Sequence, residues 1–94
     1  MDQQAVGLVR TERPVPYMKQ LCRHFQHKLE VSFDDDAGRI EFRSATCQLR
    51  PVGADLLQIE VEAGTEADLD RAKDVVKRHL ERFGRRDSLE LKWQ

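Results

Sequence analysis

Three side chains in the N-terminal third of the chain have types and a spacing that could support metal chemistry. His24 and His27 are three residues apart, and Tyr17 lies two turns before His24, so in a helix all three share one face. Two such imidazoles could share a transition metal, or one could ligate haem iron beside Tyr17. Cys22 falls more than about 120° from His27, so further ligands would have to come from another element. Because structural zinc takes four ligands, we favour a polar edge beside the core.

A fourth candidate, His79, lies among apolar residues, between Val76 and Phe83 in the pattern of a second helix. A buried imidazole is usually neutral and hydrogen-bonded to a backbone carbonyl or a hydroxyl group. Catalytic use of His79 would need a cleft and a second titrating group, and the sequence identifies neither. We therefore expect a packing role for His79.

Three arginines, Arg82, Arg85 and Arg86, cluster around the end of this second helix. Cations at this place complement the helix dipole, which is the interpretation we favour. The alternative is an anion site for a phosphate, a carboxylate-bearing iron chelate or an acidic partner.

Composition excludes several classes of function. The 94 residues suffice for one domain, and 16 basic against 17 acidic side chains leave a net charge of −1. A nucleic-acid or anionic-membrane binder would show a basic excess. We find no apolar run of membrane-spanning length and no signal-peptide core. Two cysteines are too few for a disulfide scaffold, so we expect a protein of the reducing cytoplasm. We also expect a monomer or a weak dimer.

Hydrophobic periodicity predicts two helices, over residues 16–28 and 65–86. In the longer one, Thr65 with Asp68 resembles a capping box, and Gly84 fits a left-handed cap after the end. Its apolar face places four residues among the best buried of the chain: Val76, His79, Leu80 and Phe83. Alternating patterns predict strands over residues 5–12, 29–33, 39–43, 45–50, 57–63 and 89–93.

The predicted order is β-α-β-β-β-β-α-β, with a mostly antiparallel sheet. Each strand has one apolar row, so both helices should cover the same face in a two-layer α+β sandwich, similar to the α–β plait of TATA-binding-protein-like folds. The other face is predicted to carry charges of both signs and no aromatic residues. An RNA-recognition sheet needs aromatic platforms, which excludes that function.

Two segments carry a family resemblance: residues 17–28 (YMKQLCRHFQHK) and residues 79–86 (HLERFGRR). Together with residues 38–42 and 47–49 they resemble the bacterial domain-of-unknown-function family DUF2218, over nearly the whole chain. Members of that family also occur fused to or beside siderophore-interacting flavin reductases. The resemblance thus implies a link to iron release from ferric siderophores. It carries over no catalytic residues, and the chain is too short to hold the flavin and nicotinamide domains of a reductase.

We therefore expect a non-catalytic accessory or ligand-binding domain in siderophore and iron utilisation that works with such a reductase. One alternative is a small metal- or haem-handling protein or enzyme that uses His24, His27 and His79. Another is a structural interaction domain without a small ligand. No resident cofactor is predicted, although the histidines leave iron and haem open. The candidate ligand- or partner-binding residues are Tyr17, His24, His27, Arg82, Arg85 and Arg86.

Overall fold

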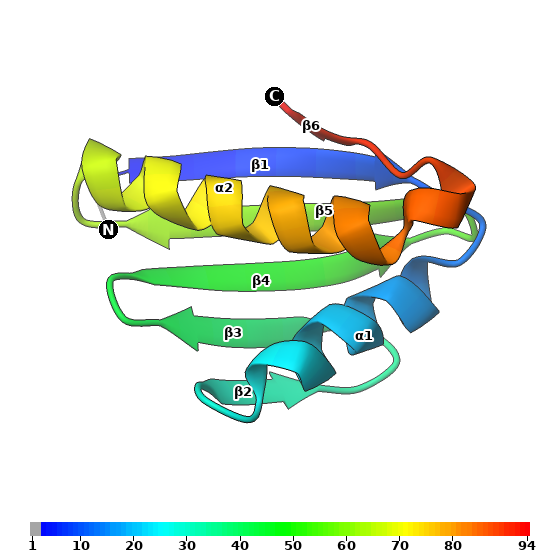
Figure 1. The fold of residues 1–94 in the computed structure, drawn as a ribbon, viewed down its shortest axis with the longest axis horizontal. Helices are drawn as coiled ribbons and strands as arrows, with labels where there is room; N and C mark the ends of the chain where they lie inside the picture. Colours follow the sequence, from blue (N-terminus) through cyan, green and yellow to red (C-terminus); the bar gives the residue numbers. More distant parts are fainter. Residues whose placement is uncertain (1–2) are drawn as a thin grey trace.

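The structure of the chain, a computed structural model, describes residues 3–94 (Figure 1). The elements confirm the predicted order and the α+β class. Their bounds are β1 Gln3–Arg10, α1 Pro14–Phe25, β2 Glu30–Phe33, β3 Gly38–Phe42, β4 Ala45–Val52, β5 Leu56–Ala63, α2 Glu66–Phe83, a 3-10 turn η1 Arg85–Asp87 and β6 Leu91–Trp93.

The six strands form one antiparallel sheet in the order β2-β3-β4-β5-β1-β6. Strands β2 to β5 are neighbours in sequence and in space, as expected of a meander. β1 pairs with β5, where Gly7 lies opposite Ile59, and with β6, where Gly7 lies opposite Trp93. The first strand is therefore held between the meander and the last strand.

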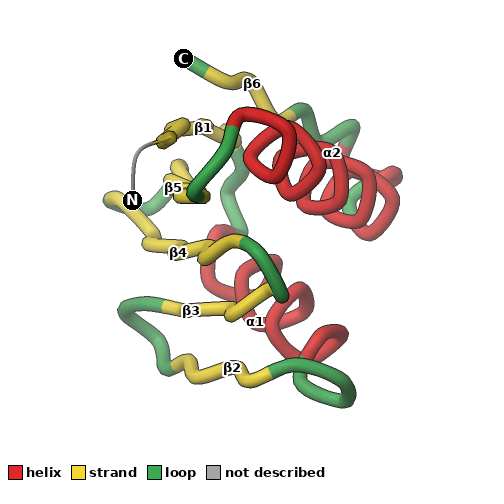
Figure 2. The backbone as a smooth tube through the Cα atoms, turned by 90° about the vertical axis from the view of Figure 1, so that its left-hand side faces the viewer, coloured by secondary structure: helices red, strands yellow, loops and turns green. Residues whose placement is uncertain are grey.

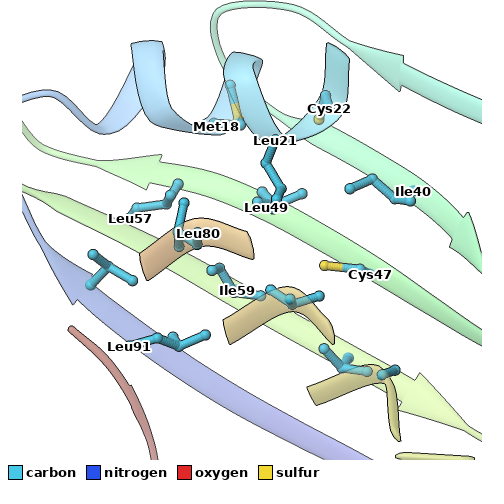
Figure 3. Close-up of a cluster of buried hydrophobic side chains, with 14 of the residues drawn as sticks. Met18, Leu21, Cys22, Ile40, Cys47, Leu49, Leu57, Ile59, Leu80 and Leu91 are labelled. Carbon is cyan, nitrogen blue, oxygen red and sulfur yellow. The ribbon is translucent and has the colours of Figure 1, made fainter. Parts of the chain in front are cut away.

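Both helices lie on one face of the sheet, and the other face carries no helix from the described residues (Figure 2). Strand β5 shows the reason, because its alternate residues Leu57, Ile59, Val61 and Ala63 are all 0% exposed. An apolar row on one face can be removed from water only if another layer packs on that face. The two helices supply that layer, and their buried side chains meet those of the strands in one core (Figure 3).

Helix α1 begins at Pro14 and packs over β2, β3 and β4. Its prolines lie in the first turn, where the missing amide hydrogen leaves no helical bond unmade. Met18, Leu21 and Cys22 are fully buried beneath it (Figure 3). Across the described residues, neither helix combines the length and the apolar character needed to cross a bilayer.

The packing of helix α2 agrees with the prediction at the N-cap, Val76 and Leu80 and differs from it at His79 and Phe83. Its N-cap is as expected, with the Thr65 hydroxyl accepting a hydrogen bond of 3.1 Å from the Asp68 backbone amide. Val76 and Leu80 are 0% exposed, as predicted. His79 and Phe83, however, are only partly buried, because their side of the helix faces α1 rather than the sheet.

The end of α2 also differs from the prediction. Gly84 has a φ of −98°, so it is not a left-handed cap, and the residue in the left-handed region is Ser88 with a φ of 54°. Gly84 is required for a different reason: a Cβ atom at this position would overlap the side chain of Leu89. Leu89 is buried, and its backbone amide donates a hydrogen bond to the Gly84 carbonyl. The chain can therefore turn back tightly toward β6 only without a side chain at this position.

The burial difference along α2 leads to a stability prediction. Leu80→Ala should lower the free energy of unfolding by about 2–5 kcal/mol, because it leaves a cavity in the core. Phe83→Ala should cost less, because the Phe83 ring is partly solvated and its site can fill with water. Chemical denaturation of the two variants would measure both losses. A larger loss for Phe83→Ala would place that ring in the core and contradict the helix orientation described here.

The close approach at Gly84 leads to a second prediction, with another glycine as its control. Gly84→Ala should destabilise the protein by about 1–3 kcal/mol, because the added methyl group overlaps Leu89. A methyl group added at Gly64 would meet no other atom within 4 Å. Gly64→Ala should therefore change the free energy of unfolding by less than about 0.5 kcal/mol. Equal effects of the two substitutions in a denaturation experiment would refute the packing explanation.

Candidate functional site

The two helices meet along one line on the covered side of the sheet, and three of the six candidate binding residues, Tyr17, His24 and Arg86, lie along it. We call this line the interhelical seam. It consists of Arg13, Tyr17, Gln20 and His24 from α1 and the residue before it, and of His79, Phe83, Arg86 and Asp87 from α2 and η1. The start of α1 lies beside η1, and its end lies beside His79, so the helices run in opposite directions along the seam.

A hydrogen bond joins the two sides of the seam at the end where the start of α1 meets η1. The Tyr17 hydroxyl donates to the carboxylate of Asp87, 70 residues away in the sequence. Tyr17 is 8% exposed, so it is buried and does not form the polar edge that the sequence pattern favoured. The hydrogen bond to Asp87, followed by burial, raises the pKa of Tyr17. The Arg13 guanidinium lies 6.0 Å from the centre of the Tyr17 ring.

This end of the seam contains a shallow cavity of about 240 Å³, which we call the arginine hollow. Its lining residues are Arg13, Pro16, Tyr17, Gln20, Phe83, Arg86 and Asp87. Two guanidinium groups and one carboxylate leave a net charge of +1, and the two aromatic rings add apolar surface. The structure thus brings together Tyr17 and Arg86 of the predicted set. Arg82 and Arg85 are exposed and are not part of this lining.

The other end of the seam holds two imidazoles that the sequence did not pair. The ring centres of His24 and His79 are 4.9 Å apart, and Phe25 and Phe83 pack against both rings. Nδ1 of His79 lies 2.7 Å from the backbone carbonyl oxygen of Val75. Because a carbonyl only accepts hydrogen bonds, Nδ1 carries a hydrogen, and in the tautomer with this hydrogen alone Nε2 has a free electron pair. The expected bond from His79 to a backbone carbonyl is confirmed.

His24 is exposed, yet its surroundings disfavour the imidazolium form. Desolvation, followed by the charges of His79, His27, Lys28 and Arg82, lowers the pKa of His24. A lowered pKa keeps this imidazole neutral at neutral pH, which is the form that binds metal ions.

The sequence predicts that His24 and His27 share a helix face, but in the structure they do not. Helix α1 ends at Phe25, and His27 lies exposed in the turn that follows. The turn forms because the Lys28 and Leu29 amides both donate to the Phe25 carbonyl and lead the chain into β2. Among residues 3–94, no three His, Cys, Asp or Glu side chains come together in a metal-binding group.

The two cysteines, Cys22 of α1 and Cys47 of β4, are buried in the core, and both are free thiols. Burial raises the pKa of Cys22 to about 11. Burial also raises the pKa of Cys47, with a smaller contribution from Cys22. Thiols that resist ionisation are poor nucleophiles and poor metal ligands, so neither belongs to the candidate site.

Sequence reasoning missed several features of the surface. Arg13 could have been found from its helical spacing to Tyr17, but Asp87 reaches the hollow only through the tertiary turn after α2.

The uncovered sheet face is also less polar than expected. Val6 and Leu8 of β1 lie opposite Glu60 and Gln58 of β5, so they point to the uncovered side. The sequence does not reveal which side of β1 is buried, because β1 carries apolar residues on both sides. Gly7, which has no side chain, lies on the covered side against Trp93.

Comparisons with known proteins agree with this architecture. The NMR structure of PA4090 from Pseudomonas aeruginosa is similar to this chain, with a TM-score of 0.80 and 33% sequence identity. The match covers 97% of this chain and 94% of that one. No curated protein matches the chain. A family model described as an uncharacterized protein conserved in bacteria, DUF2218, matches residues 6–94. The chain therefore belongs to the bacterial DUF2218 family.

Proposed function

We propose that the protein is a non-catalytic binding domain in siderophore and iron utilisation, and that the arginine hollow holds part of an anionic iron chelate. The observation that carries this proposal is the meeting of Arg13 and Arg86 beside the Tyr17 and Phe83 rings. Guanidinium groups bind carboxylate and other oxyanions with directed hydrogen bonds, and they stack on flat rings. Siderophores present such partners, because they carry carboxylates or aromatic rings with oxygen donors.

The size of the hollow indicates how such a ligand would be held. Pockets that enclose small molecules usually have volumes of about 300–1,000 Å³. The hollow has about 240 Å³ and is open to solvent, so it can grip one arm of a chelate and leave the rest accessible. A second protein could then reach the metal, as an accessory role requires.

The properties of the reactive groups in and outside the hollow favour binding over catalysis. The Tyr17 hydroxyl donates a hydrogen bond to Asp87, and its raised pKa keeps it protonated at neutral pH. The thiols of Cys22 and Cys47 are buried and resist ionisation. The other main groups of the hollow are the guanidinium groups of Arg13 and Arg86 and the Phe83 ring, which are suited to bind an anion and to pack against it.

The proposed partner is a siderophore-interacting flavin reductase, because domains that this chain resembles occur fused to or beside such enzymes. A reductase would supply electrons to the ferric ion while the arginine hollow orients the chelate. We place this activity in the reducing cytoplasm, where two free thiols are stable.

An amide-shift titration tests the proposal. A gallium(III) complex of a carboxylate siderophore, a diamagnetic substitute for the ferric complex, is added to labelled protein. We expect shifts at residues 13–20 and 83–87. Arg86→Gln should weaken binding by roughly ten- to a hundredfold, because a hydrogen bond to a charged group contributes about 1.5–3 kcal/mol. The matched control is Arg50→Gln on the uncovered sheet face, which should leave the affinity unchanged.

Two results would contradict the proposal. Shifts confined to the uncovered face around Gln48 and Glu60 would move the site away from the hollow. An absence of shifts with both the chelate and an added flavin reductase would remove the link to iron.

A further inference from the structure

We propose that His24 and His79 form a binding site for a divalent metal ion of the zinc, nickel or copper type, with the remaining coordination positions open to water or an anionic ligand. The site lies at the opposite end of the seam from the arginine hollow. It joins two helices and does not rest on the proposed chelate binding.

The separation of the two rings matches coordination to one ion. A zinc–nitrogen bond of about 2.0–2.1 Å places the centre of an imidazole ring about 3.2 Å from the metal. Two rings on one ion then have centres about 5 Å apart at a tetrahedral angle and about 4.5 Å apart at a right angle. The His24 and His79 centres are 4.9 Å apart. Two axial imidazoles on opposite sides of a haem would be about 6.5 Å apart, so the pair fits a single ion better than haem.

The hydrogen bond of His79 also suits metal binding. Metal-binding histidines usually donate their second ring hydrogen to a carboxylate, a carbonyl or water, which fixes the tautomer. His79 makes this bond through Nδ1 to Val75, leaving Nε2 for a metal.

The two rings are held in place before any ion arrives. His24 lies edge-on to Phe25 with ring centres 4.9 Å apart, and 5.4 Å from the centre of Phe83. His79 lies 5.1 Å from the centre of Phe25. Each histidine also belongs to a helix anchored in the core. Ligands on rigid elements lose little conformational entropy on binding, which favours a site with only two protein ligands.

Nearby charges shape the site further. The charges of Lys28 and Arg82 are close enough to disfavour the imidazolium form of His24. They oppose a bare dication in the same way, and they favour anionic ligands such as carboxylate or phosphate at the open positions. We therefore expect a bound ion that exchanges readily and keeps accessible positions, rather than a closed structural zinc site.

The test is a titration of protein purified without a histidine tag. Zn²⁺ is followed through the imidazole NMR signals, and Co²⁺ is followed through its visible absorption. We expect shifts of the His24 and His79 ring signals and a rise of the thermal unfolding midpoint with added Zn²⁺. His24→Phe and His79→Phe, which keep an aromatic ring in the cluster, should each weaken binding by about tenfold or more, because each removes one of the two ligands. His27→Ala is the matched control and should bind as the unchanged protein does.

If His79→Phe does not fold, His79→Gln replaces it and should show the same loss. Binding that survives in a folded His79 variant would overturn the proposal. So would binding abolished by His27→Ala, or unchanged ring signals at millimolar Zn²⁺. The metal titration contains no siderophore, so its failure would leave the arginine hollow untouched, and a failed chelate titration would leave this metal site untouched.

Discussion

The burial of both helices against one face of the sheet is the constraint on which the other features of the molecule depend. The strands of the sheet direct apolar side chains to that face, and the row on β5 is completely excluded from water. Two helices confined to the same face must lie side by side and must satisfy the polar groups between them. The Tyr17–Asp87 hydrogen bond does this at one end, where it ties α1 to the turn after α2. At the other end the rings of His24, His79 and Phe83 pack together, and Nδ1 of His79 bonds the Val75 carbonyl of its own helix.

The seam concentrates the groups that can recognise a ligand because polar side chains of both helices meet there at the edge of the core. Guanidinium groups gather at one end and imidazoles at the other, and Phe83 contributes to both. The Phe83 ring packs against the core and is still partly exposed. A ring that is held in this way and reaches solvent offers an apolar contact next to charged groups, a combination common at binding surfaces.

The fold could be predicted because it follows from local patterns. Alternation in β4 and β5, the helical spacing in α2 and the cap at Thr65 each depend on neighbours in the sequence. The candidate site could be predicted only in part. A helical wheel finds the apolar face that contains His79 and Phe83, but it does not tell which part meets the sheet and which part meets another helix. The pairing of His24 with His79 depends on where the helices cross, and the role of Gly84 depends on the later position of Leu89.

The most direct test of the interhelical seam is the distance between the His24 and His79 imidazoles in the metal-free protein. With the ring signals of all three histidines assigned, a nuclear Overhauser experiment reports which ring hydrogens are close. We expect cross-peaks between His24 and His79, and from each of them to the Phe83 ring. Sharp ring signals from His24 and His79 without a cross-peak between them would contradict the interhelical seam, because its two imidazoles would then not be neighbours.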